Sequence, residues 1–168
     1  IKFARFFRIA FFFPQVMSVV VVAVLWSFIY HPTIGLLNGF LQAIGISGAQ
    51  NFPWLGDRGT VFGAVLAMVV WQSVGFYMVL FVAGMQGIPP EFYEAAELDG
   101  ANSWVKFWNV TVPLVWDTIR TAIVFLAIGA MDLFAPVTVM TNGTGGPSRA
   151  ADVVPTYLYS TAFSDGQF

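Results

Sequence analysis

The polar residues most able to do chemistry lie in one stretch, residues 88–101, which reads Ile-Pro-Pro-Glu-Phe-Tyr-Glu-Ala-Ala-Glu-Leu-Asp-Gly-Ala. Four of the nine acidic residues of the chain fall within it: Glu91, Glu94, Glu97 and Asp99. The run before it, 60–90, carries no charge, and the chain turns apolar again at Val110. This contrast predicts a short helix held outside a lipid bilayer, between two membrane-spanning segments.

Local signals place the ends of this helix. Pro89 and Pro90 suit its first positions, where a missing N–H costs nothing. Gly100 can adopt the left-handed conformation that ends a helix. Asn102 or Ser103 can then cap a second helix. The spacing alone leaves two interpretations open: a solvated loop helix, or a helix that docks into a groove of another protein.

The chain lacks the residues that catalysis, metal binding or phosphate binding would need. His31 is the only histidine and there is no cysteine, so no catalytic or metal constellation is expected, and His31 is predicted to be an interfacial loop residue. The glycine-rich stretch 142–147 has no Gly-Lys pair and is not a phosphate-binding loop. The net charge of −2 says nothing about nucleic acid, but the sequence has no basic patch to bind it. We therefore expect no catalytic residue, no metal and no cofactor.

The composition is that of a membrane protein. Hydrophobic residues make up 58% of the 168-residue chain and charged residues only 10%, whereas soluble domains carry about 25% charged residues. Long apolar runs predict an all-α protein with three spans, at about 9–30, 60–86 and 115–140. Cations at Lys2, Arg5 and Arg8 place the start of the first span in the cytoplasm. The polar loop 88–112 is then cytoplasmic, and loops 31–59 and 141–168 lie outside.

Several polar residues fall inside the predicted spans. Gln72 and its neighbours lie in the middle of the second span, where they either make helix–helix hydrogen bonds or line a path for a solute. Asp132 lies in the outer half of the third span, with the same two interpretations open, and Pro136 is predicted to kink or end that helix one turn later. Asp117 and Arg120, three residues apart, are predicted to pair.

The stretch Glu94-Ala-Ala-Glu-Leu-Asp-Gly-Ala101, followed by Phe107 and Val110-Thr-Val-Pro113, resembles the "EAA" loop of the membrane subunits of binding-protein-dependent ATP-binding cassette (ABC) importers. One departure is Asp117, where the family often has a second proline. The resemblance covers almost the whole chain, including Trp71-Gln72, Ala83-Gly-Met-Gln86 and the Gly-Gly-Pro turn that ends at Pro147. It is strongest to the carbohydrate and glycerol-phosphate uptake branch.

The resemblance implies a partial helical-bundle transmembrane domain of a bacterial inner-membrane permease. Intact members usually have about six spans, so this chain is expected to hold the third to fifth. The implied partners are cytoplasmic ATPase subunits, a second permease subunit and an extracytoplasmic solute-binding protein, with ATP hydrolysed on the separate ATPase chain. This branch of the family usually pairs two different permeases, and the sequence leaves a homodimer open. The residues implied to couple to the ATPase are Glu94, Ala95, Ala96, Asp99, Gly100 and Ala101, in what we call the coupling loop, 88–112.

A sugar or related solute needs aromatic faces and convergent hydrogen-bonding groups. Gln72 and Phe76 share a helical face with Tyr77 on its flank, and Gly129 and Asp132 share a face of the third span. These five residues are the candidates for the solute pathway. The alternative function is a secondary transporter or channel subunit that ATP does not drive. That class often shows inverted repeats, and this sequence contains no internal repeat.

Overall fold

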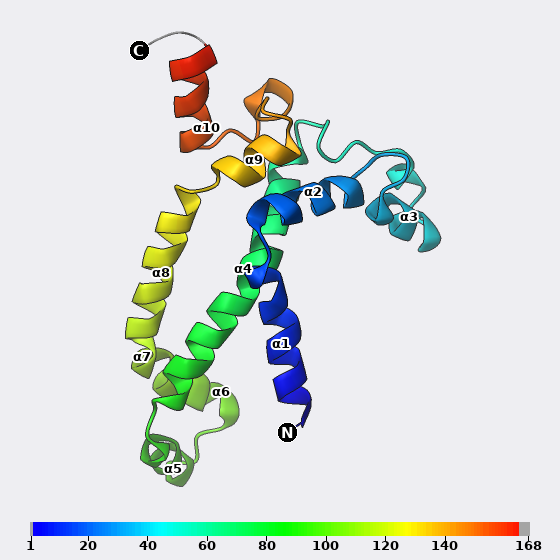
Figure 1. The fold of residues 1–168 in the computed structure, drawn as a ribbon. Coiled ribbons are helices and arrows are strands. Elements are labelled where there is room, and N and C mark those ends of the chain that lie inside the picture. The colour runs from blue at the N-terminus through cyan, green and yellow to red at the C-terminus, as the bar shows by residue number, and fades with distance from the viewer. Residues whose placement is uncertain (1, 165–168) are drawn as a thin grey trace. The chain divides into compact units, whose positions relative to one another are not determined.

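The computed structural model describes residues 2–164, which form helices joined by turns, without a strand among them (Figure 1). Residues 165–168 of the predicted outer loop, and the side chains of Lys2 and Arg5, lie outside the described part. The chain divides into two compact units. The first unit comprises residues 1–12 and 74–128, and the second comprises 13–73 and 129–168.

The first unit contains most of α1 (Lys2–Val16), the second half of α4 (Val61–Gln86) and nearly all of α8 (Trp116–Ala130). Two glycines on α4 let its neighbours approach closely, as small residues do in membrane helices. A methyl group at Gly75 would meet the Phe11 carbonyl of α1, and one at Gly84 would meet the side chain of Thr118 on α8. Between α4 and α8 the chain forms four short helices: α5 (Pro90–Leu98), α6 (Ser103–Lys106), the π-helix η2 (Phe107–Thr111) and α7 (Val112–Leu114).

The second unit is built on α2 (Val19–Ile29), the first half of α4 and α9 (Phe134–Met140). Its core contains Val22, Val61, Met68 and Val137, all almost fully buried. Tyr30 closes one end of it, where its hydroxyl donates to the carbonyl of Ala64 at 3.2 Å. The remaining elements of this unit are α3 (Leu36–Ala43), η1 (Ser47–Ala49), η3 (Pro147–Arg149), α10 (Val154–Tyr159) and the π-helix η4 (Ser160–Ser164).

The continuous helix expected at 9–30 does not form. Helix α1 begins earlier, at Lys2, and ends at Val16, and α2 begins at Val19. Pro14 therefore lies in the last turn of α1, where it has no backbone N–H to donate, and the helix continues two residues beyond it to Val16. Ser18 is then extended, with φ −58° and ψ 131°.

The helix expected at 115–140 is also interrupted. Helix α8 ends at Ala130 and α9 begins at Phe134, so Asp132 lies in the break between them. Pro136 explains the position of this break, because a proline ring clashes with the carbonyl four residues earlier, which here belongs to Asp132. The predicted helical face shared by Gly129 and Asp132 is thus absent. The break comes before the proline, and not one turn after Asp132 as the sequence analysis proposed.

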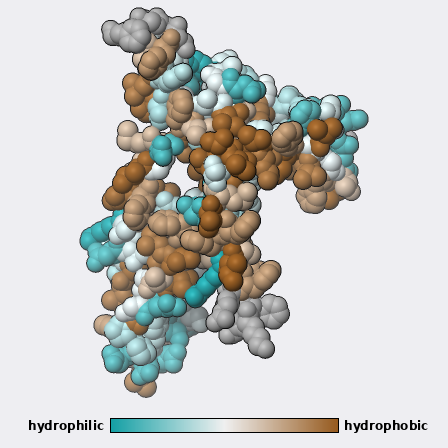
Figure 2. All heavy atoms as spheres, in the orientation of Figure 1, coloured by the Kyte–Doolittle hydropathy of each residue, from teal (hydrophilic) through white to brown (hydrophobic). Residues whose placement is uncertain are grey.

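Apolar side chains cover much of the surface of the described chain, whereas polar ones gather over α5 (Figure 2). Among residues 2–164, α4 is the one helix both long and apolar enough to cross a membrane unbroken. Two pairs of helices meet the same criteria if each broken pair makes one span: α1 with α2, and the 103–114 segment with α8. The second pair bends by 66°.

The contact at Gly75 yields a stability prediction. Gly75→Ala should lower the free energy of unfolding by about 1–3 kcal/mol, since the added methyl group would lie 2.7 Å from the Cα of Phe12 and force the helices apart. Gly63→Ala is the matched control on the same helix, where a methyl group meets no described atom within 4 Å. Thermal unfolding in detergent measures both, and equal midpoints would contradict the predicted close packing at Gly75.

Candidate functional site

The coupling loop begins with the predicted proline-led helix. Pro89 is the N-cap of α5, with φ −58° and ψ 137°, and Pro90 is the first helical residue. Pro89 still contributes its carbonyl, which accepts a hydrogen bond from the N–H of Phe92 at 3.3 Å. Glu91 lies in the first turn, where the helix dipole favours a negative charge. The local sequence thus determines where this helix starts.

A glycine elbow ends α5. Gly100 has φ +76°, the left-handed conformation predicted for it. Its N–H donates to the carbonyl of Glu97 at 3.0 Å, and the N–H of Ala101 donates to the carbonyl of Ala96 at 2.9 Å. This pair of bonds is the Schellman arrangement, which satisfies the last carbonyls of a helix. The elbow therefore fixes the direction in which the chain leaves the coupling helix.

The second helix starts as predicted at Asn102. Its side-chain oxygen accepts a hydrogen bond from the N–H of Val105 at 2.9 Å, which caps α6. The helix then widens into the π-turn η2 before Pro113. Proline has no N–H for the carbonyl four residues back and clashes with it, and a wider turn relieves that conflict. Beyond the bend, the predicted Asp117–Arg120 pair is confirmed, with 3.0 Å between Oδ1 and Nη1.

The coupling candidates differ in their surroundings. Glu94, Ala95 and Asp99 are exposed, and so is Gly100. Ala96 and Ala101 are partly buried. No hydrogen bond or ion pair of the Glu94 side chain is present within residues 2–164. Its carboxylate therefore projects from the helix with both oxygens available to an outside group.

Glu97 behaves differently from Glu94. Its Oε1 accepts a hydrogen bond from Nζ of Lys106 at 2.6 Å, across the elbow. This hydrogen bond and the Lys106 charge lower the pKa of the Glu97 carboxyl. Glu97 is thus engaged within the loop itself.

Tyr93 and Thr111 also meet in this loop, and the sequence analysis missed them. The Tyr93 hydroxyl lies 3.0 Å from Oγ1 of Thr111. Thr111 is buried in η2, and Tyr93 is partly buried on the face of α5 that packs against η2. The three-residue spacing of Tyr93 and Ala96, the two least exposed positions of α5, is the signal that could have identified its inner face.

The five pathway candidates are divided between the units. In the second unit, Nε2 of Gln72 donates to the carbonyl of Met17 at 3.2 Å, in the break between α1 and α2. Gly129 and Asp132 are exposed at the end of α8 and in the following turn. In the first unit, the ring of Phe76 contacts those of Tyr77 and Phe125 edge-on, with centroids 5.3 and 5.6 Å away.

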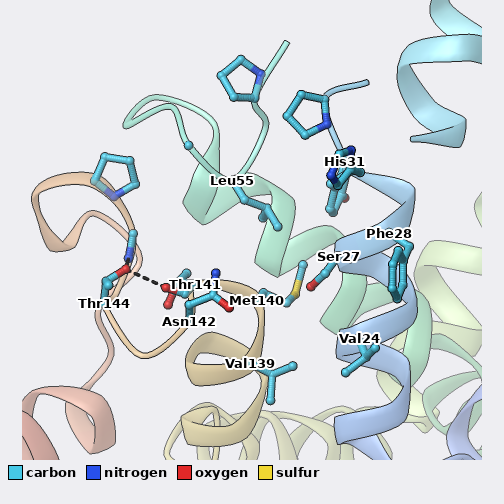
Figure 3. A pocket seen from close by; sticks show the side chains of 16 residues that line it. Val24, Ser27, Phe28, His31, Leu55, Val139, Met140, Thr141, Asn142 and Thr144 are labelled. Carbon is cyan, nitrogen blue, oxygen red and sulfur yellow. Dashed lines mark hydrogen bonds between the residues drawn. The ribbon is translucent and has the colours of Figure 1, made fainter. Parts of the chain in front are cut away.

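A pocket of about 830 Å³ lies in the second unit, between the predicted outer loops and the adjoining ends of the first and third predicted spans (Figure 3). Its walls are mainly apolar, and its polar side chains are Ser27, Tyr30, His31, Thr141, Asn142 and Thr144. Several of these already have partners inside the chain. Ser27 donates to the carbonyl of Ala23 at 2.9 Å, and Nδ1 of His31 lies 3.3 Å from the N–H nitrogen of Thr33, which donates to it. The sequence analysis had placed no pocket here.

Curated relatives resemble the chain throughout its length. The diacetylchitobiose uptake system permease protein NgcF of Streptomyces coelicolor is 39% identical over 168 residues, covering 100% of this chain and 47% of the relative. The probable ABC transporter permease protein YurN of Bacillus subtilis is 42% identical, covering 97% and 55%. The lactose transport system permease protein LacF of Rhizobium radiobacter is 31% identical, covering 97% and 54%. The chain thus spans about half the length of these relatives.

Solved structures show the same fold. A bacterial ABC transporter involved in the import of the acidic polysaccharide alginate superposes with a TM-score of 0.82 at 23% identity, covering 99% of this chain and 57% of that one. The same kind of transporter, in complex with a periplasmic protein that holds an alginate pentasaccharide, gives a TM-score of 0.80. Residues 2–164 match the family described as the binding-protein-dependent transport system inner membrane component, and the chain belongs to that family.

Proposed function

We propose that the chain forms part of the permease subunit of an ABC importer in the bacterial inner membrane. Its helices contribute to the pathway for a sugar or related solute, and the coupling loop binds a separate ATPase subunit. The observation that carries this proposal is the geometry of α5. It is a short, exposed, acidic helix with a fixed exit angle, and the free carboxylate of Glu94 projects from it.

The proposed mechanism needs no nucleotide site on this chain. ATP binding closes two ATPase subunits in the cytoplasm, and the coupling helices seated on them move with them. The spans then tilt between inward-open and outward-open arrangements. A solute-binding protein delivers the solute at the outer face, and a second, different permease subunit completes the pathway. The coupling candidates Glu94, Ala95, Ala96, Asp99, Gly100 and Ala101 form the contact with the ATPase.

The solute class is proposed from the relatives. Diacetylchitobiose and lactose appear in the names of two of them. We place the solute path along Gln72, Phe76, Tyr77, Gly129 and Asp132, which supply aromatic, amide and carboxylate groups. Sugars are bound by such combinations.

Copurification tests the proposal directly. The full-length permease should bring an ATPase subunit with it, and transport in liposomes should require ATP. Transport that follows an ion gradient without ATP would instead support the alternative, a secondary transporter or channel.

Glu94 should anchor α5 to the ATPase through a charge-assisted hydrogen bond. Glu94→Ala is expected to weaken ATPase binding about tenfold, the factor for losing one hydrogen bond to a charged group. Glu91→Ala is the matched control. Glu97 is unsuitable as a control because it already pairs with Lys106. Binding measured by titration of the two purified partners decides this, and equal affinities for both variants would favour a merely solvated helix face.

Gly100→Val should abolish transport while membrane insertion stays normal. A methyl group at Gly100 meets no described atom within 4 Å, so the cost comes from the positive φ alone. That conformation costs a residue with a side chain roughly 1–2 kcal/mol and is worse for a β-branched one. Gly100→Asn is the control, since asparagine tolerates this region. Transport rates should separate the two variants, and a fully active valine variant would refute the elbow's role.

Single cysteines test the pathway residues in a chain that has no cysteine of its own. Substitutions at Gln72, Phe76, Tyr77, Gly129 and Asp132 should react with aqueous thiol reagents in the resting or the ATP-trapped state, because a solute path is wet. Cysteines at Val70 and Ile123, two exposed apolar positions outside the proposed path, serve as controls. The assignment is wrong if all five candidates stay unlabelled in both states while nearby positions react.

A further inference from the structure

The coupling loop contains two cross-links that the elbow alone does not require. We call them the brace: the hydrogen bond between Tyr93 and Thr111, and the ion pair between Glu97 and Lys106. Both start on α5 and end on the helical segment beyond the elbow, 18 and 9 residues further along the chain. Tyr93 and Glu97 lie four residues apart, so they are neighbours on one side of α5.

The two links differ in their environment. The Thr111 side of the hydrogen bond is buried, with Thr111 only 7% exposed. Without the tyrosine hydroxyl, the buried Thr111 hydroxyl would keep only its long hydrogen bond to the carbonyl of Lys106, at 3.5 Å, and losing the better partner is costly away from water. The ion pair is open to solvent on the glutamate side, where the Glu97 side chain is 63% exposed, and more covered on the lysine side, at 20%. Solvent screens such a pair, so the hydrogen bond is the stronger link.

Together with the elbow, the brace joins α5 to the next segment at three points. The elbow sets the direction in which the chain leaves α5, but its hydrogen bonds hold the two segments at that one point only. With Tyr93 and Glu97 both tied across, a swing of α5 about Gly100 must break a hydrogen bond and an ion pair. We infer that Tyr93, Thr111, Glu97 and Lys106 are positioning residues that make 90–111 one rigid lever, so that motion of α5 reaches α8 and is not absorbed at the elbow. This inference rests on the proposed coupling function.

The test uses the full-length permease assembled with its ATPase in liposomes. Tyr93→Phe and Thr111→Val each remove one hydroxyl while keeping shape. Each should raise hydrogen exchange of the backbone amides of α5 about fivefold, the factor for losing one ordinary hydrogen bond. The double variant should exchange no faster than either single one, because both act through the same bond. Solute carried per ATP should fall by a similar factor, while the ATPase still copurifies.

Two controls sharpen the result. Tyr157→Phe removes a hydroxyl from an exposed tyrosine of the second unit and should change neither exchange in α5 nor solute carried per ATP. Glu97→Lys and Lys106→Glu should each loosen α5, and combining them should restore the slow exchange by reversing the pair.

The outcomes separate the brace from the proposed function. Unchanged exchange in both hydroxyl variants refutes the brace, whatever happens to transport. Faster exchange with unchanged solute per ATP shows that the brace exists and refutes its role in coupling. A wild-type permease that binds no ATPase refutes the proposed function, and the coupling role with it.

Discussion

A peptide group in a membrane must find its hydrogen-bond partner within the protein, and this constraint governs where the present chain can depart from a helix. In the predicted third span Pro136 explains the departure, because its ring clashes with the carbonyl of Asp132 in the break after α8. The break between α1 and α2 follows Pro14, and there the carbonyl of Met17 has a partner, since Nε2 of Gln72 donates to it.

The same constraint bears on the two interpretations of the polar residues inside the apolar segments. Gln72 could be read as a solute ligand or as a structural hydrogen-bond donor, and the structure gives it a backbone carbonyl to satisfy. Asp132 stands in a helix break, exposed, and not on a regular helical face.

The sequence predicted well wherever the signal was local. The proline-led start of α5, the left-handed Gly100, the Asn102 cap and the Asp117–Arg120 pair all depend on residues within a few positions of each other. The predicted end of the third span was wrong, because a proline disturbs the helix at the residues before it. Pro136 was recognised, but its ring displaces the carbonyl four residues earlier, so the break precedes it. The Tyr93–Thr111 hydrogen bond could not be predicted from the sequence, because the side of the helix on which Thr111 lies depends on the π-turn that contains it.

The contacts within the coupling loop are also short in sequence. Its elbow closes over five residues, and its two cross-links over 9 and 18. Contacts between near neighbours form quickly and need little chain to be present. The loop can therefore assemble once Thr111 has left the ribosome, before the whole of α8 has emerged from it. The coupling loop is then already folded while the next helix is still entering the membrane. A mutation in the loop would therefore disturb the order of assembly as well as the finished protein.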